Sequence, residues 1–272
     1  RALRQRRPAL VLPGALARDG DGYREVDDTS MTDALADIRL SRTGRYLAIG
    51  RAGEVGYELF RREGTGWRSL GRLPAWPSGC AFSDDESLFV AMSSGGQGFT
   101  LWRLTGDEPE LIVTETMVNT EVPSGFTFSR SGVLAVGDTP GDVTLYSLAD
   151  PARPVVMQQL RDARSSISQL TFSADGRTLL ASTREGLVWV WAGDGHDRFE
   201  LDLRLKTRSA SVPGVTMIGE HIVMSLSEGR IVAWPRDSRA QRPKLCEQFG
   251  TPLSNSEWER LVPGVDRIDG CA

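Results

Sequence analysis

Few residues in this chain have the types and spacing that catalysis requires. It has two histidines, and both are expected in polar turns: His196 lies within Gly193–Asp197, and His221 opens an apolar strand pattern. The sequence contains no glycine-rich phosphate loop and no Gly-x-Ser-x-Gly nucleophile turn. Paired acids such as Asp84 and Asp85 fall at turns, where aspartate bonds to nearby backbone. We therefore predict no catalytic, cofactor-binding or metal-binding residues, and expect any catalysis in an upstream domain.

Three cysteines, Cys80, Cys246 and Cys271, offer a second kind of chemistry. Cys80 lies in an apolar strand pattern and is expected to be a small buried residue. Cys246 and Cys271 bracket a short C-terminal segment, and a disulfide between them would stabilise it by about 3 kcal/mol through loop closure. That bond needs an oxidising compartment, whereas in a reducing cytosol both would remain thiols. The sequence leaves both states open.

The segment between Cys246 and Cys271 predicts a short capping helix. Ser254 and Glu257 have the spacing of a capping box. Trp258 and Leu261 are three residues apart and share one helix face, and Pro263-Gly264 would end the helix. About two turns of helix are not stable alone, so we expect Trp258 to dock on the neighbouring domain as a structural cap. Binding of a partner by this helix is the alternative.

The strands that must position these residues are predicted from a sequence pattern that recurs along the chain. An apolar strand ends in Phe-Ser or a relative, a tight turn follows, and a second apolar strand begins. The serines of successive copies, at positions 41, 83, 129 and 173, are 42, 46 and 44 residues apart. A period in the forties, with several short strands in each unit, is typical of a β-propeller blade.

The fourth copy shows the organisation of one unit most clearly. Ile167–Phe172 is the predicted inner strand, Ala174–Arg177 the turn, Thr178–Ser182 the second strand and Leu187–Trp191 the third. A linker strand completes the unit. We predict an all-β fold: a β-propeller of four-stranded blades, with about five to six blades visible, forming part of a seven-bladed ring with a short C-terminal capping helix.

The repeats divide the chain into three parts. Residues 37–240 are expected to form the blades, and residues 241–272 the C-terminal cap and tail. Residues 1–36 are expected to supply the end of a preceding blade, through Ala9–Leu12, followed by an acidic loop from Arg18 to Asp33. Because the sequence begins inside this pattern, we expect it to belong to a longer protein.

Composition limits the partners. The net charge is −4 and the isoelectric point about 5.4, which argues against a nucleic-acid partner, since that needs clustered positive charge. No apolar run approaches the roughly 20 residues of a membrane-spanning helix. We expect a cytoplasmic location, with the outer side of a membrane-anchored parent as the alternative.

The repeated units resemble the WD-repeat family over about residues 37–234. In that family the third strand of a blade closes with Trp-Asp, and Gly-His precedes the inner strand. Trp102, Trp191 and Trp234 occupy the tryptophan position, but no aspartate follows them, and the Gly-His pairs are absent. The family's polar network cannot form in full here. These blades are therefore expected to rely on packing and strand hydrogen bonds, with the third-strand tryptophans in the core between blades.

Two further phrases are similar to those of bacterial WD-repeat arrays. Leu148–Pro154 resembles their blade-linking Asp-Pro-x-Arg-Pro sequence. The stretch from Cys246 to Cys271 resembles a tail that closes many such arrays, although Leu261 stands where the family often has tyrosine. In that family the tail belongs to large signalling proteins, often STAND-type nucleotide-hydrolysing switches. The resemblance implies a sensor or scaffold module of a larger bacterial signalling protein.

Such a module would bind a protein partner on its loop face. Trp76 and Arg164 are candidate contacts because both fall in predicted loops that enter an inner strand, and because aromatic and arginine side chains are enriched in binding hot spots. Packing of the loop is the alternative role for Trp76. A propeller enzyme, either a hydrolase or a quinone-dependent dehydrogenase, and a structural spacer are the competing functions. Clustered carboxylates in the central channel would favour the enzyme, and a mixed surface would favour binding.

Overall fold

A computed structural model of the chain consists of β-strands throughout its described part. It describes residues 15–19, 22–26, 35–64, 66–115, 122–193, 198–237 and 254. These residues form 21 strands, arranged in six antiparallel sheets, and include no helix. The predicted all-β class is therefore confirmed for this part of the chain.

Four of the sheets have four strands each, paired in chain order. They are β3 (Leu35–Leu40), β4 (Tyr46–Arg51), β5 (Tyr57–Glu63) and β6 (Gly66–Leu73); β7 (Ala75–Phe82), β8 (Leu88–Ser93), β9 (Phe99–Arg103) and β10 (Glu110–Glu115); β11 (Pro123–Phe128), β12 (Val133–Asp138), β13 (Val143–Ser147) and β14 (Val155–Leu160); and β15 (Ile167–Phe172), β16 (Thr178–Thr183), β17 (Leu187–Gly193) and β18 (Phe199–Lys206). A fifth sheet has three strands, β19 (Gly214–Ile218), β20 (His221–Ser225) and β21 (Ile231–Pro235).

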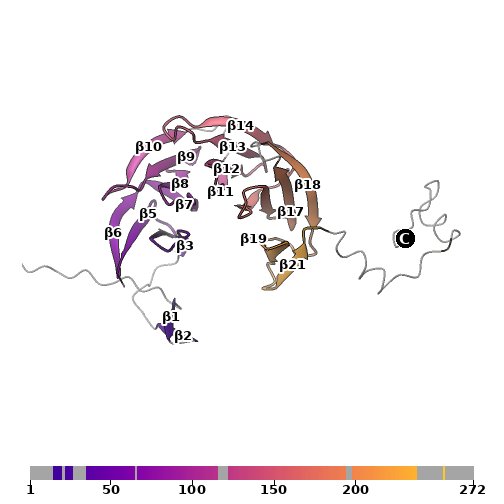
Figure 1. The fold of residues 1–272 in the computed structure, drawn as a ribbon, viewed down its shortest axis with the longest axis horizontal. Coiled ribbons are helices and arrows are strands. Elements are labelled where there is room, and N and C mark those ends of the chain that lie inside the picture. Colours follow the sequence, from indigo (N-terminus) through magenta and orange to yellow (C-terminus); the bar gives the residue numbers. More distant parts are fainter. Residues whose placement is uncertain are drawn as a thin grey trace, which may run out of the picture.

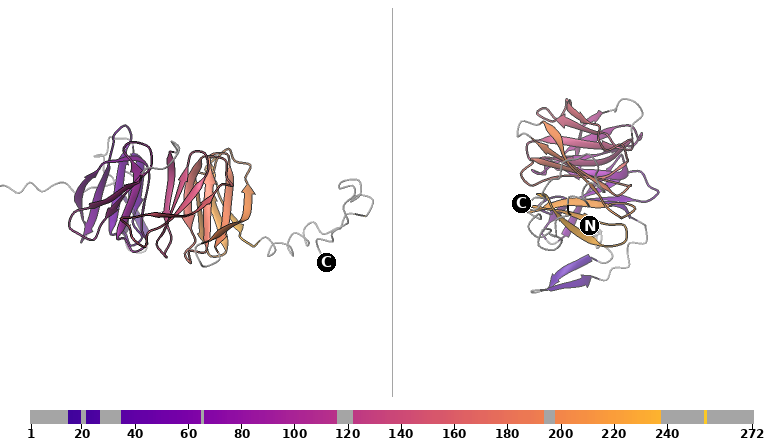
Figure 2. Two further views of the ribbon diagram at one scale, coloured as in Figure 1. Left: turned by 90° about the horizontal axis from the view of Figure 1, so that it is seen from above. Right: turned by 90° about the vertical axis from the view of Figure 1, so that its right-hand side faces the viewer.

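These five sheets follow one another along an arc, with the first strand of each on the inner side and β6, β10, β14 and β18 on the outer side (Figure 1). Neighbouring inner strands are in contact, from β3 through β7, β11 and β15 to β19. The side view shows the sheets stacked face to face (Figure 2). This arrangement is propeller-like. The strands predicted for the fourth unit agree with β15, β16 and β17 to within two residues.

The recurring serine closes the first turn of each of the four-stranded sheets. Its Oγ accepts a hydrogen bond from the backbone N–H that opens the second strand. The four N···Oγ distances are 2.9 Å from Tyr46 to Ser41, 2.9 Å from Leu88 to Ser83, 3.0 Å from Val133 to Ser129 and 2.9 Å from Thr178 to Ser173. The repeat that defines the sequence is thus a turn motif, in which a side chain replaces a missing backbone partner.

Apolar side chains fill the space between successive sheets. Trp102 packs between the first and second sheets with Tyr46 and Phe89, and Trp191 packs between the third and fourth with Leu145. Both tryptophans are buried, as predicted. The same prediction is wrong for Trp234, whose side chain is 41% exposed on β21, because the described residues supply no strand beyond this last strand of the fifth sheet.

The N-terminal region differs from its predicted loop. The acidic stretch from Arg18 to Asp33 was expected to lack regular structure, but β1 (Ala15–Asp19) and β2 (Gly22–Val26) form an antiparallel hairpin that includes part of it. Tyr23 and Val26 are residue types that favour strands, even where the composition is acidic.

Several predictions concern residues outside the described part. Ala9–Leu12, Cys246, Glu257, Trp258 and Cys271 all lie there, so the preceding blade, the disulfide and the capping helix stay predictions. Ser254 is described, and it belongs to no helix or strand. Over the described residues, no helix has the length and apolar character to cross a bilayer.

Candidate functional site

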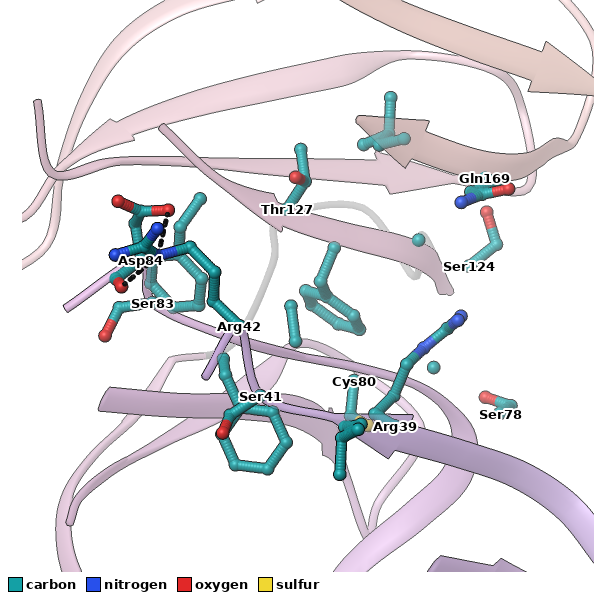
Figure 3. Close-up of a pocket in the computed structure, with 18 of the residues that line it drawn as sticks. Arg39, Ser41, Arg42, Ser78, Cys80, Ser83, Asp84, Ser124, Thr127 and Gln169 are labelled. Atoms are coloured by element: carbon teal, nitrogen blue, oxygen red, sulfur yellow. Dashed lines mark hydrogen bonds and ion pairs between the residues drawn. The ribbon is translucent and has the colours of Figure 1, made fainter. Parts of the chain in front are cut away.

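The inner strands of four consecutive sheets line a cavity of about 290 Å³ (Figure 3). Its wall combines polar and apolar side chains from β3, β7, β11 and β15 and from the turns that follow β3 and β7. The polar members include Arg39, Arg42, Ser78, Asp84, Ser124, Thr127, Ser168 and Gln169, and the apolar ones include Leu40, Phe82, Phe126, Phe128 and Leu170.

Arg39 crosses one end of this cavity. Its guanidinium extends from β3 toward Ser78 on β7 and Ser124 on β11, with Gln169 of β15 nearby (Figure 3). Gln169 Oε1 accepts a hydrogen bond from the backbone N–H of Val215, with N···O 3.1 Å. The amide group of Gln169 is thereby fixed, and its NH₂ group remains able to donate.

A buried polar cluster behind the cavity orients Arg39. Asp37 Oδ1 lies 3.5 Å from Arg39 Nε. The other carboxylate oxygen, Oδ2, accepts the Tyr57 hydroxyl at 2.7 Å and lies 3.5 Å from Cys80 Sγ. Tyr57 Oη in turn accepts the backbone N–H of Gly79 at 3.2 Å. Asp37 is therefore held in one position and can hold the guanidinium beside it.

The electrostatics of this cluster keep both donors neutral. Burial, reinforced by the charge of Asp37, raises the pKa of the Cys80 thiol well above its ordinary value. Burial is also the largest cause that raises the pKa of the Tyr57 hydroxyl. Neutral O–H and S–H groups donate to the carboxylate of Asp37, which a thiolate or phenolate would repel. Cys80 is buried with a free thiol, as the sequence predicted.

An ionic group closes the other end of the cavity. Asp84 Oδ1 lies 3.3 Å from Arg42 Nε, and Asp84 Oδ2 lies 3.4 Å from Arg130 Nε. Arg42, Asp84 and Arg130 each come directly after the turn serine of one of three successive sheets. The same position of the repeat therefore meets its copies at this end of the cavity. Among the described residues that line the cavity, Asp84 is the one carboxylate.

Glu86 links the first two sheets beside this group, and sequence reasoning missed it. The backbone φ of Glu86 is 60°. The other three four-stranded sheets have a glycine at the same position, three residues after the turn serine. These are Gly44, Gly132 and Gly176, with φ of 73°, 84° and 73°. Glu86 Oε1 accepts the backbone N–H of Thr43 at 2.6 Å, and the Thr43 hydroxyl lies 2.8 Å from Oε2. Burial alone would raise the pKa of Glu86, but these hydrogen bonds outweigh it and lower the pKa. A glutamate in a glycine position was the available signal, since such backbone is strained for it.

Trp76 and Arg164 lie where inner strands begin. Trp76 belongs to β7 rather than to the preceding loop, which corrects the predicted location, and its side chain is 45% exposed. Arg164 is exposed and has φ of 47°, in the loop before β15. Trp191 Nε1 donates to Asp162 Oδ2 at 2.8 Å and fixes this loop. The two candidate contacts are on the second and fourth sheets, with β11 between their inner strands.

Neither histidine is among the described residues of this site. His196 lies outside the described residues, and His221 is exposed at the start of β20. Within the described ranges, no three His, Cys, Asp or Glu side chains gather as a group that could hold a metal ion.

No protein-family model matches this sequence, and no curated protein matches it. The resemblance to bacterial WD-repeat arrays therefore stays a prediction.

Proposed function

We propose that this chain is a non-catalytic propeller module that binds a protein partner on the face where its inner strands begin. The observation that carries the proposal is the exposure of Trp76 on β7, two residues before Ser78, which lines the cavity. A large aromatic side chain exposed beside a concave surface has the properties of a binding hot spot.

The second candidate contact is also on a fixed backbone. The hydrogen bond from Trp191 to Asp162 anchors the loop that carries Arg164. On its other side the loop packs closely against Gly141, where a Cβ atom would lie 2.4 Å from the backbone nitrogen of Ser165. A contact residue on an ordered loop loses little conformational entropy on binding, which favours affinity.

The cavity lining supports binding over the propeller-enzyme alternative. Asp84, the one carboxylate of the described lining, is already paired with Arg42 and Arg130. Glycoside hydrolysis, for example, uses two carboxylates about 5–10 Å apart across the substrate. A mixed wall of hydroxyl, amide, guanidinium and apolar groups instead suits the recognition of a polypeptide segment.

We also propose that the arc is part of a seven-bladed ring in a larger, cytoplasmic bacterial signalling protein. The outer faces of the first and last sheets support this. Ile38 is exposed on β3, and Ile218 and Ile231 are exposed on the fifth sheet, Ile231 by 77%. Sheets inside the arc bury the equivalent faces against a neighbour, so further blades would cover these side chains.

A peptide selection tests the binding proposal. Random peptides displayed on phage are selected on the wild-type chain, and their affinities are then measured for Trp76→Ala/Arg164→Ala. We expect affinity to fall by about tenfold or more, as for the loss of hot-spot residues. The matched control, Leu111→Ala/Arg68→Ala, removes an exposed apolar and an exposed basic side chain from the outer strands and should bind as wild type. Failure to select any peptide, or equal binding by both double variants, would overturn the proposal.

A further inference from the structure

We infer that the cavity contains a carboxylate-binding site anchored by the guanidinium of Arg39. The inference rests on the proposed function and specifies its chemistry. The partner segment would place an acidic side chain, or its own C-terminal carboxylate, between β3, β7, β11 and β15.

Hydrogen-bond donors from four strands converge at this end of the cavity. Arg39 extends toward Ser78 and Ser124, and Gln169 lies beside them (Figure 3). The hydroxyl contacts are long: Ser78 Oγ lies 3.6 Å from Met92 Sδ, and Ser124 Oγ lies 3.4 Å from the carbonyl oxygen of Gly137. Hydroxyl groups in such weak contacts can rotate toward a stronger acceptor. A carboxylate accepts several hydrogen bonds at once and matches this set of donors.

Arg39 has one ion-pair partner before any ligand arrives, and its side chain is 46% exposed. Asp37 pairs with Nε, the nitrogen nearest the chain, at 3.5 Å. Tyr57 and Cys80 fix the carboxylate of Asp37 from behind. The two terminal nitrogens of Arg39 remain available to a carboxylate in a paired geometry, because no described residue bonds to them. A guanidinium held by its Nε loses less freedom when it binds, which increases affinity.

The local charge favours a monoanion. At this end of the cavity Arg39 is paired with Asp37, while at the other end Arg42 and Arg130 share Asp84. A carboxylate adds a single negative charge beside the Arg39–Asp37 pair, whereas a phosphate dianion would add two near Asp37.

The size and the apolar wall indicate what carries the carboxylate. The volume, about 290 Å³, is at the small end of ligand sites, which span about 300–1,000 Å³. It suits a side chain or a chain end rather than a folded element. Phe82, Phe128 and Leu170 line the same cavity and can contact apolar residues that flank the acid.

Three fluorescein-labelled hexapeptides with leucine flanks test the site by fluorescence anisotropy with the full chain. The first has a central glutamate and an amidated C-terminus, the second a central glutamine and a free C-terminus, and the third a central glutamine and an amidated C-terminus. We expect the first or second to bind about tenfold or more tightly than the third, as a charge-assisted hydrogen bond predicts. The peptide that binds more tightly than the third shows whether the carboxylate comes from a side chain or from the C-terminus.

Variants at the anchor give the decisive comparison. Arg39→Gln should abolish the preference for a carboxylate, and Arg68→Gln, a surface control on β6, should keep it. Asp37→Asn removes a negative charge, so a purely electrostatic site would bind more tightly. We expect weaker binding by about threefold instead, because Arg39 loses its positioning partner. Circular dichroism and thermal melting check that each variant is folded.

The outcomes separate this inference from the proposed function. Equal binding of all three probes, lost in Trp76→Ala, would overturn the carboxylate site and leave the binding module in place. A carboxylate preference that survives Arg39→Gln would also overturn the site. If no probe binds, the site is overturned, whereas the peptide selection on Trp76 and Arg164 still decides the proposed function independently.

Discussion

The fourth and fifth sheets have similar third-strand sequences, but the tryptophans on these strands are buried to different extents. Trp191 on β17 and Trp234 on β21 both belong to third strands rich in β-branched and aromatic residues. Trp191 is fully buried, while 41% of the Trp234 side chain is exposed. The fourth sheet has neighbours on both faces and a fourth strand, β18. The fifth has three described strands, so no described fourth strand lies beside β21, although Trp234 is paired with Ile222 on the face that packs against the fourth sheet.

The two sheets also differ in their first turns. In the fourth, Ser173 accepts the N–H of Thr178 and its hydroxyl donates to Asp175. In the fifth, β19 and β20 are joined by two residues, Gly219 and Glu220, with no such serine. The comparison teaches that the strand pattern specifies a sheet, whereas burial and turn hydrogen bonds determine how much each sheet contributes to stability.

Replacement of each tryptophan by alanine should give the largest difference in stability between the two sheets. Trp191→Ala should lower the free energy of unfolding by about 3–5 kcal/mol, because a large side chain leaves a cavity between sheets. Trp234→Ala should cost less, about 1–2 kcal/mol, because 41% of this residue is already exposed. Urea denaturation followed by far-ultraviolet circular dichroism measures both, and equal losses would contradict the assignment.

The next contrast is between a buried hydrogen bond of the fourth sheet and an exposed ion pair that joins the fourth sheet to the fifth. Asp162→Ala leaves the buried Trp191 Nε1 without its acceptor, and we expect a loss of about 1–3 kcal/mol. Asp202→Ala removes an exposed ion pair with Arg236, 3.6 Å apart, which should cost about 1 kcal/mol or less. A cycle with Trp191→Phe checks the mechanism, since Asp162→Ala should cost little once the indole nitrogen is absent.

The turn serine gives a smaller contrast. Ser173→Ala removes the acceptor for the Thr178 N–H and should cost about 1 kcal/mol. Glu220→Ala changes the turn residue of the fifth sheet, whose exposed side chain is expected to contribute within about 0.5 kcal/mol. Chemical denaturation at one pH compares them, and a loss in Glu220→Ala as large as that in Ser173→Ala would contradict the role of the serine.

The smallest expected effect is on acid stability. The Ser173 hydroxyl lowers the pKa of Asp175 below its ordinary 3.8, and the Ser209 hydroxyl lowers the pKa of Glu228 below its ordinary 4.5. A carboxyl whose pKa is lower in the folded state stabilises it above the ordinary pKa, and the contribution disappears as pH falls through the lowered value.

Asp175→Asn and Glu228→Gln should therefore each reduce the drop in melting temperature between about pH 6 and about pH 3. Both side chains are exposed, so solvent screening keeps the change small in both sheets. The measurement is a thermal melt at a series of pH values, and an unchanged drop in both variants would show that these hydrogen bonds do not persist in solution.

Much of the fold could be predicted because its signals are local. The serine, the turn aspartate or glycine and the alternating strands act within one unit, and they predicted β15, β16 and β17 closely. The cavity could not be predicted in the same way. Arg39, Ser78, Ser124 and Gln169 are separated by tens of residues, and the arc of sheets brings them together.

The sequence by itself determined the repeating unit, since period, turn chemistry and apolar alternation are all properties of short segments. The tertiary structure alone decided which third-strand tryptophan is buried, that Glu86 reaches across to Thr43, and that Asp37 positions Arg39. The physical reason is that burial, and hydrogen bonds between sheets, depend on which neighbour each sheet packs against. A repeated local pattern cannot specify this, because every unit carries nearly the same pattern.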